Sequence, residues 1–440
     1  MAVSGIVGTM ALICTPKNKR SYNMKSFTPY PHQLEIADKA ISILKENRLA
    51  YLACSPRVGK TIASLIVCDR MNYKSVLFVT KAKAISSVEK DFKLCGFNFN
   101  LSTVSHAGLH KAKDQYDCII IDEAHAFGSF TQGKQSKRSI QLEELAKSKD
   151  VIYLSGTPSP EDYLQVYHQF KISSYSPFEE PTFWEFIKNY GTIEQVYQRG
   201  RTVNIFNNTK PQLILDKIKP LMVCYSREDA GFEESADLEE HEEFVTMKEQ
   251  TSNYLYWLEN DGYISDLQGH HLEPKDKNGR LTKAVQIASG TVKTDTGESL
   301  TIDNSKALRI KQIAGDKRII IFYSYKQELN MLKEVFPFYT LSADEFQDGK
   351  CPVMLAQIVS QREGVDMSAA DLLFFLTVPF SSVSMQQGIA RILNKKRTKK
   401  AIVYWMLNKP TSYLTSIGHI ALKCVRSKQK FTATYFENNN

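Results

Sequence analysis

The chain contains 440 residues, of which 42% are hydrophobic and 24% are charged, the balance of a soluble globular protein. No apolar run approaches the ~18 residues that a membrane-spanning helix needs, so we expect no membrane segment. The eight cysteines form no CxxC pair, so the sequence supports neither a zinc site nor a disulfide framework and favours reduced thiols in the cytoplasm. The length predicts two domains, and the net charge of +8 suits a polyanionic partner.

The first half of the chain alternates short apolar runs with helical patterns. Gly5–Cys14 is apolar but follows no basic residue, so it predicts a buried strand rather than a signal peptide. Further strands are predicted at Leu49–Cys54, Ser75–Thr80, Asp117–Asp122 and Val151–Leu154, with a helix at about Ile62–Arg70. Strands that alternate with helices predict a parallel sheet with helices on both faces.

The second half repeats this pattern, so the predicted fold class is α/β with two tandem, doubly wound parallel-sheet lobes, residues 1–226 and 227–440. The acidic stretch Glu228–Glu243 is a candidate linker between the lobes. Residues 261–303 are rich in Gly, Asp, Lys and Thr and predict an insertion of loops or a small hairpin. The second-half strands are predicted at Arg318–Tyr323, Val353–Gln357, Leu372–Leu376 and Ala401–Met406, and the helices at Lys326–Phe336 and Ser382–Leu393.

A Gly-Lys-Thr segment, Cys54–Thr61 (CSPRVGKT), follows one predicted strand and opens a helix. Backbone N–H groups in such a loop bind phosphate oxygens. We therefore expect an ATP site in which Lys60 reaches the β- and γ-phosphates and Thr61 holds Mg²⁺ through its hydroxyl. Cys54 stands where the general pattern has its first glycine. The predicted ATP-binding residues of the loop are Arg57, Gly59, Lys60 and Thr61.

In the segment Ile119–His125 (IIIDEAH), an apolar run is followed by two carboxylates, Asp122 and Glu123. Asp122 is predicted to hold Mg²⁺, and Glu123 to orient and activate the attacking water, because phosphoryl transfer needs both charge neutralisation and an in-line nucleophile. The alternative is a polar strand end without chemistry. The phosphate-binding loop about sixty residues upstream favours a catalytic pair.

Asp122–His125 (DEAH) resembles the signature box of superfamily-two helicases, and other motifs of that family follow in order from about Tyr30 to Leu407. The resemblance implies two RecA-like lobes with an ATP cleft between them. Tyr30–Gln33 (YPHQ) resembles the glutamine motif, which implies that Gln33 reads the adenine edge. The other first-lobe motifs, FVTK, VSH and LSGTP, imply nucleic-acid contacts at Thr80, Lys81, Ser105 and His106, and coupling of hydrolysis to lobe movement at Ser155 and Thr157.

The second lobe continues the series with Ile319–Ser324 (IIIFYS), Ser360–Asp366 (SQREGVD) and Gln387–Arg391 (QGIAR). By this resemblance Arg391 is a catalytic arginine that reaches the γ-phosphate. The implied nucleic-acid contact is Ser360, and the implied ATP-cleft residues are Gly364, Asp366 and Gln387.

One departure concerns the last motif, which usually carries a second arginine three residues after the first. Here that position is Asn394, and the next arginine is Arg397. Either Arg391 serves alone as the arginine finger, or Arg397 substitutes for the missing residue. An arginine finger contributes about 10³–10⁵ in rate, so the choice is testable.

Two segments resemble the Swi/Snf-like branch of these translocases, Phe183–Tyr190 (FWEFIKNY) and Leu281–Gly290 (LTKAVQIASG). The compact chain is similar to DNA branch-migration helicases of tailed phages. This implies a monomeric, ATP- and Mg²⁺-dependent DNA helicase that remodels forks and Holliday junctions in a bacterial or phage-infected cytoplasm. An RNA helicase, a duplex translocase that separates no strands, and a degenerate DNA-binding scaffold remain alternatives.

Two regions are candidates for DNA contact besides the motifs. The first is Arg391–Lys430, which holds eleven Lys or Arg residues and no Asp or Glu. The charge is unevenly distributed, since Glu228–Glu243 holds nine acidic residues. A basic surface attracts the phosphate backbone, although a plain solvated surface has the same composition. Lys83 is a further candidate. A Gly-Arg turn between β-prone segments in Val196–Thr209 predicts a hairpin that touches DNA.

Overall fold

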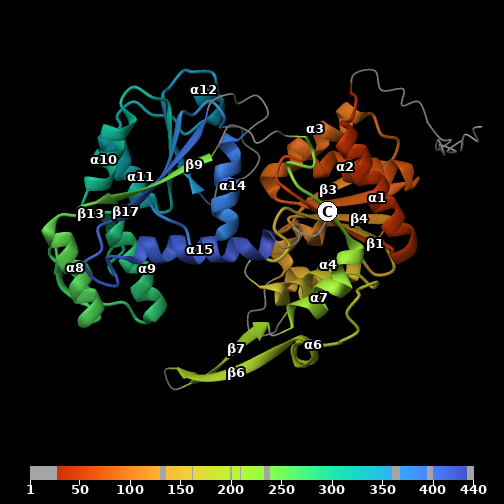
Figure 1. Cartoon of the computed structure of the whole chain (residues 1–440), viewed down its shortest axis with the longest axis horizontal. Coiled ribbons are helices and arrows are strands. Elements are labelled where there is room, and N and C mark those ends of the chain that lie inside the picture. The colour runs from red at the N-terminus through yellow and green to blue at the C-terminus, as the bar shows by residue number, and fades with distance from the viewer. Residues whose placement is uncertain are drawn as a thin grey trace, which may run out of the picture.

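The computed structural model describes residues 27–113, 115–128, 135–160, 162–198, 201–208, 210–231, 238–358, 367–393 and 400–433. They form two RecA-like α/β lobes, a small region attached to the second lobe, and a hairpin that stands off the first lobe (Figure 1). The predicted strand at Gly5–Cys14 lies outside the described residues. Within them, no helix combines the length and the apolar character that crossing a membrane requires.

The first lobe contains a parallel sheet in the order β3-β2-β4-β5-β1-β8. Alternate side chains of its central strands enter two separate cores, so Tyr51 and Tyr153 pack on one face and Leu52 and Leu154 on the other. The strands are β1 (Leu49–Cys54), β2 (Ser75–Thr80), β3 (Asn100–Ser105), β4 (Cys118–Asp122), β5 (Asp150–Ser155) and β8 (Met222–Tyr225). The helices are α1 (Pro31–Asn47), α2 (Lys60–Arg70), α3 (Ile85–Cys95), α4 (Lys137–Leu145), α5 (Val166–Phe170), α6 (Phe183–Tyr190) and α7 (Pro211–Ile218).

The second lobe contains a parallel sheet in the order β15-β14-β16-β17-β9. Its two faces are again covered by separate buried clusters. The strands are β9 (Leu238–Val245), β14 (Ile319–Tyr323), β15 (Val353–Gln357), β16 (Leu372–Phe375) and β17 (Ala401–Asn408). The helices are α10 (Ser305–Ala314), α11 (Lys326–Val335), α12 (Ala343–Gln347), α14 (Ser382–Ile392) and α15 (Ile417–Ala433).

The acidic stretch predicted as a linker is in part a strand, which corrects that prediction. Strand β9 runs along β17 at the edge of the second sheet, and its glutamates meet basic partners there. Lys400 lies 2.7 Å from Glu239, and Arg426 forms ion pairs with Glu240 and Glu242. The acidic stretch and part of the basic stretch therefore neutralise each other. The first sheet ends at Tyr225, and the boundary predicted between residues 226 and 227 falls before β9.

The predicted insertion, residues 261–303, is more regular than expected. Together with α8 (Glu249–Asn260) it forms a small subdomain with its own buried core, which Leu414 and Ile417 complete. It contains α9 (Lys277–Ala288) and two antiparallel hairpins, β10–β11 (Ile264–Leu267 and His270–Leu272) and β12–β13 (Thr291–Lys293 and Ser299–Thr301).

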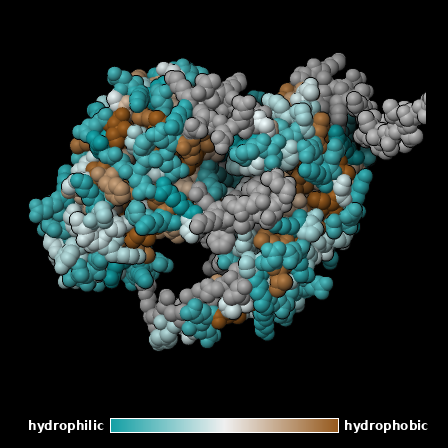
Figure 2. Space-filling view, viewed as in Figure 1, coloured by the Kyte–Doolittle hydropathy of each residue, from teal (hydrophilic) through white to brown (hydrophobic). Residues whose placement is uncertain are grey.

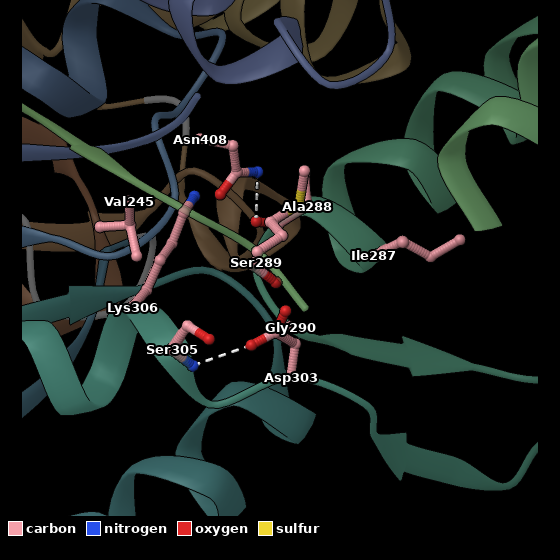
Figure 3. Close-up of a pocket in the computed structure, with 10 residues that line it drawn as sticks. Val245, Ile287, Ala288, Ser289, Gly290, Asp303, Ser305, Lys306 and Asn408 are labelled. Carbon is pink, nitrogen blue, oxygen red and sulfur yellow. Dashed lines mark hydrogen bonds between the residues drawn. The ribbon is translucent and has the colours of Figure 1, made fainter. Parts of the chain in front are cut away.

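Figure 3 shows the joint between this subdomain and the second lobe, where residues of both line a small pocket. The Asn408 amide donates to the Ala288 carbonyl at 2.8 Å. Gly290 has φ +96°, and a Cβ there would lie 1.8 Å from the Asp303 carbonyl oxygen, so only glycine fits. The buried Lys306 side chain extends toward Asn408, and burial lowers its pKa to about 8.

The hairpin predicted within residues 196–209 is confirmed and begins earlier. Strands β6 (Gly191–Gln198) and β7 (Arg201–Asn208) pair antiparallel from Gly191 opposite Asn208 to Gln198 opposite Arg201. The ribbon projects from the first lobe below the gap between the lobes in Figure 1. At its base the Phe206 ring packs edge-on against Phe183 and Trp184 of α6.

Candidate active site

The phosphate-binding loop lies between β1 and α2, at the carboxyl edge of the first sheet. Gly59 has φ +92°, and a Cβ there would lie 2.1 Å from the Gln33 amide nitrogen, so this position needs glycine. The Lys60 ammonium folds back over the loop and donates to the carbonyls of Cys54 at 2.7 Å and Ser55 at 3.1 Å. The loop therefore holds its lysine at the mouth of the cleft.

The glutamine motif wraps around this loop. Gln33 accepts from the Tyr30 N–H at 3.0 Å, and a His32 ring nitrogen lies 2.9 Å from the Val58 carbonyl. The Tyr30 ring stacks on His32 with centroids 5.5 Å apart, and Tyr30 is 54% exposed. Gln33 thus lies against Gly59, next to an exposed aromatic face. This arrangement is compatible with the predicted adenine contact, which stays a prediction.

The two predicted catalytic carboxylates lie together at the end of β4. Glu123 has φ +52°, an uncommon conformation for a residue other than glycine. Burial, and secondly the Glu123 charge, raises the pKa of Asp122 to about 6. Burial opposes ionisation of Glu123 as well, but the nearby His125, Lys81 and Lys60 outweigh it and lower the pKa of Glu123. The pair therefore divides into a carboxyl that protonates readily and a carboxylate that stays ionised.

Two residues predicted to touch nucleic acid, Thr80 and His106, face the catalytic strand in this structure, and their contacts with nucleic acid stay a prediction. Thr80 is fully buried, and its hydroxyl donates to the Asp122 carboxylate at 2.7 Å. His106 is 7% exposed, and its Nε2 lies 3.0 Å from the Asp122 carbonyl. Burial lowers the pKa of His106 to about 4, so it is neutral at neutral pH. Both side chains hold Asp122 from the side of β2 and β3.

The predicted coupling residues connect the ends of β4 and β5. His125 Nδ1 lies 3.0 Å from the Ser155 hydroxyl and 3.3 Å from the Glu123 carboxylate. The Ser155 hydroxyl accepts from the Thr157 N–H at 3.0 Å. His125 and the Ser155 hydroxyl thus connect the Ser155–Thr157 segment to Glu123.

Helix α14 of the second lobe closes the site. The Gln387 amide donates to the Glu123 carboxylate at 3.1 Å, and the Ser382 hydroxyl donates to the Pro160 carbonyl at 3.2 Å. A cavity of about 150 Å³ lies between the lobes. It is lined by Pro56, Arg57, Lys60, Glu123, Gly156 and Thr157 of the first lobe and by Gln386, Gln387, Ala390 and Arg391 of the second.

The structure thus brings Arg57, Lys60, Glu123, Gln387 and Arg391 to one cavity, although they come from three distant segments. The predicted Ser360, Gly364 and Asp366, and the positions Asn394 and Arg397, lie outside the described residues.

Sequence reasoning missed Gln386 and Arg227 near this cleft. Burial, and secondly the positive charge of Arg57, lowers the pKa of Arg227. Gln386 lines the cavity beside Gln387. Arg227 belongs to no motif, and its only sequence signal is a basic residue two positions after β8. Gln386 has a clearer signal, because it precedes the QGIAR segment by one residue.

Two residues at the carboxyl edge of the first sheet fit Mg²⁺. Thr61 and Asp122 supply a hydroxyl and a carboxylate, the oxygen ligands that Mg²⁺ prefers. A divalent cation beside Asp122 and Glu123 would relieve the repulsion that contributes to the raised pKa of Asp122. Across the described part of the chain, no cluster of three or more His, Cys, Asp or Glu side chains could hold a metal ion. Mg²⁺ commonly keeps water and substrate phosphates among its ligands, so one or two protein ligands are enough to hold it.

Comparison with known proteins gives one informative relative. No protein-family model matches the chain. The chain is 22% identical over 448 residues to an uncharacterized ATP-dependent helicase, YqhH, of Bacillus subtilis (strain 168). The match covers 88% of this chain and 77% of that protein, so it includes both lobes. Together with the two RecA-like lobes, this similarity supports a helicase family for the chain.

Proposed function

We propose that this chain is an ATP-dependent DNA helicase or translocase that couples hydrolysis to movement along DNA and remodels branched DNA, such as forks and Holliday junctions. The observation that carries the proposal is the cavity in which Lys60 and Glu123 of the first lobe face Gln387 and Arg391 of the second. A site divided between two lobes links the state of its ligand to the distance between them. The similarity to an ATP-dependent helicase supports the same assignment.

The residues divide the work of hydrolysis among them. In this proposal Lys60 leaves the Cys54 and Ser55 carbonyls to bind the β- and γ-phosphates. Glu123, whose pKa is lowered, stays ionised and orients the attacking water. Arg391 approaches the γ-phosphate from the second lobe. Mg²⁺, held by Thr61 and Asp122, would neutralise phosphate charge when bound.

Lobe movement follows from these contacts. Both lobes line the cavity, so in this proposal the lobes separate to admit ATP and close around it. The Gln387–Glu123 and Ser382–Pro160 bonds must then break and re-form in each cycle. His125, Ser155 and Thr157 would transmit the change at Glu123 to the neighbouring strand.

DNA is proposed to lie across both lobes and to contact them through its phosphate backbone. Ser105, Lys81 and Lys83 are the first-lobe candidates, and such contacts suit a motor because they carry no sequence information. In the space-filling view an opening separates the lower part of the second lobe from the hairpin (Figure 2). The hairpin β6–β7 borders it, and its Tyr197 is 74% exposed. An exposed aromatic ring can stack on an unpaired base, so we assign strand separation to this hairpin.

A panel of substrates tests the proposal. Forked, four-way, tailed and blunt DNA duplexes and an RNA duplex are offered with ATP and Mg²⁺, and strand displacement and ATP hydrolysis are measured. We expect hydrolysis to be stimulated by DNA and strand displacement to favour forks and four-way junctions, while Lys60→Ala is inactive on all of them.

The alternatives give different patterns in the same panel. Stimulation by RNA alone would indicate an RNA helicase. Displacement of a triplex strand without unwinding of a duplex would indicate a duplex translocase. An absence of hydrolysis with every nucleic acid would indicate a DNA-binding scaffold and contradict the proposal.

A further inference from the structure

Arg57 lies in the phosphate-binding loop with φ +69°. The left-handed region is open to glycine but strained for an arginine, whose Cβ crowds the backbone there. Strain of this kind persists where the surrounding structure maintains it, and it clusters at functional sites. The contacts of the Arg57 side chain therefore indicate what the strained backbone supports.

The Arg57 guanidinium crosses the cleft to the second lobe. Its Nη1 donates to the Leu393 carbonyl at 2.7 Å, and its Nη2 donates to the Arg391 carbonyl at 3.1 Å. Both carbonyls lie at the carboxyl end of α14 (Ser382–Ile392), where the last turn of a helix leaves acceptors without helical partners and carries partial negative charge. The planar guanidinium presents two donors side by side, which suits two neighbouring acceptors.

We propose that Arg57 is a positioning residue, which fixes the carboxyl end of α14 to the phosphate-binding loop and so aims Arg391 at the γ-phosphate. This inference rests on the proposed function. One of the two carbonyls that Arg57 binds belongs to Arg391 itself. This hydrogen bond therefore fixes the backbone from which the Arg391 side chain extends. From the second lobe, the Met367 N–H donates to the same Arg391 carbonyl at 3.1 Å, which completes the hold on this turn.

Helix α14 is then attached to the first lobe at three points along its length. Ser382 bonds Pro160 at its beginning, Gln387 bonds Glu123 in its middle, and Arg57 grips its end. Attachments at the start, middle and end of one helix restrain its distance from the first lobe and its tilt. The tilt matters because the direction of the Arg391 side chain follows the orientation of the helix.

Arg57 also brings a positive charge to the carboxyl end of α14. The next residue after Leu393 is Asn394, where superfamily-two helicases have their second arginine. Arg57 supplies a guanidinium at Leu393 from the opposite lobe.

Kinetic measurements separate positioning from direct phosphate binding. With Arg57→Gly we expect the kcat of DNA-stimulated hydrolysis to fall roughly 10-fold or more, because two charge-assisted hydrogen bonds are lost, with KM for ATP within about 3-fold of wild type. Arg57→Lys should recover part of kcat, since an ammonium binds one carbonyl but lacks the planar fork. The double variant Arg57→Gly/Arg391→Ala should be no slower than Arg391→Ala alone, because both changes act on the same step.

Folding is controlled within the same series. Glycine relieves the strain at φ +69°, so Arg57→Gly should not lower the melting temperature. Asn72→Gly is the matched control, because Asn72 has φ +59° on the exposed surface away from the cleft, and this variant should leave kcat unchanged. A rise in KM comparable to that of Lys60→Ala, with kcat intact, would overturn the positioning role.

A second readout is independent of hydrolysis. Fluorescent labels at the exposed Leu94 of α3 and Leu308 of α10 report the distance between the lobes without nucleotide. Arg57→Gly should shift the population toward longer distances, and Asn72→Gly should not. An unchanged distribution in Arg57→Gly would contradict the attachment. If the wild-type protein hydrolysed no ATP, the proposed function would fail, while this measurement would still decide whether Arg57 joins the lobes.

Discussion

Replacing Asp122 by asparagine is expected to stabilise the nucleotide-free protein while it abolishes hydrolysis. Burial and the Glu123 charge raise the pKa of Asp122 from its ordinary value of 3.8 to about 6. A shift of about two units corresponds to ~3 kcal/mol of destabilisation when the carboxyl is ionised. Asp122 is only partly buried, so water in the cleft reduces this to about 1–2 kcal/mol. Asparagine keeps an oxygen that can accept from the Thr80 hydroxyl.

The effect has a defined pH dependence. The unfolded chain ionises Asp122 above about pH 4, whereas the folded protein holds the proton until about pH 6. The destabilisation is therefore absent below about pH 4, grows between about pH 4 and 6, and is complete above that range. The advantage of the asparagine variant should be larger at pH 7.5 than at pH 5.

Urea unfolding without nucleotide or Mg²⁺ measures this difference. Asp122→Ala is the matched control, because it removes the charge but leaves the buried Thr80 hydroxyl without its acceptor, so it should be less stable than Asp122→Asn. Adding Mg²⁺ with a non-hydrolysable ATP analogue should stabilise the wild type more than the asparagine variant and narrow the gap. An asparagine variant no more stable than wild type at either pH would refute the reasoning.

Three further predictions concern the second lobe and the hairpin. Arg391→Ala should lower stimulated hydrolysis by about 10³-fold or more, measured by phosphate release, whereas near-normal turnover would exclude Arg391 as the finger and direct attention to Arg397. Deleting residues 197–202 at the hairpin tip should leave DNA-stimulated hydrolysis intact but reduce strand displacement, and unchanged unwinding would remove the hairpin from the mechanism. Lys306→Met should raise the free energy of unfolding by about 1–3 kcal/mol below pH 8, because burial lowers the pKa of Lys306 to about 8 and its charge is costly in the folded state. This gain in stability should shrink as the pH rises from about 8 to 10, where the unfolded lysine also loses its proton. A gain that stays constant across that range would contradict the prediction.

The sheets and the position of the site could be predicted because strong local signals agree with a simple geometric rule. Apolar runs such as Leu49–Cys54 and Val353–Gln357 form strands at the predicted residues. The carboxyl ends of parallel strands meet at one edge, and Lys60, Asp122 and Ser155 follow or end such strands, which brings them to the same edge of the sheet. Local pattern and topology were sufficient for this half of the cleft.

Strands that lack an apolar pattern could not be predicted in the same way. Strand β3 (NLSTVS) is polar and lies at a sheet edge, and β8 has four residues. From the sequence alone, β9 resembles a charged linker. The residues that its glutamates contact, Lys400, Trp405 and Arg426, lie more than 150 residues away in the chain. Its strand conformation depends on those distant partners, which a local pattern does not contain.

The same limit explains what the motifs could not reveal about the cleft. A motif specifies the chemistry of a residue but not the partner it meets across the lobes. Thr80 and His106 fall in segments that resemble nucleic-acid contacts, yet their burial directs both toward Asp122. Arg57 lies 336 residues from Leu393, and only the packing of one lobe on the other joins them. The resemblance therefore locates the chemical groups, and the contacts of α14 determine how the two halves of the site are held together.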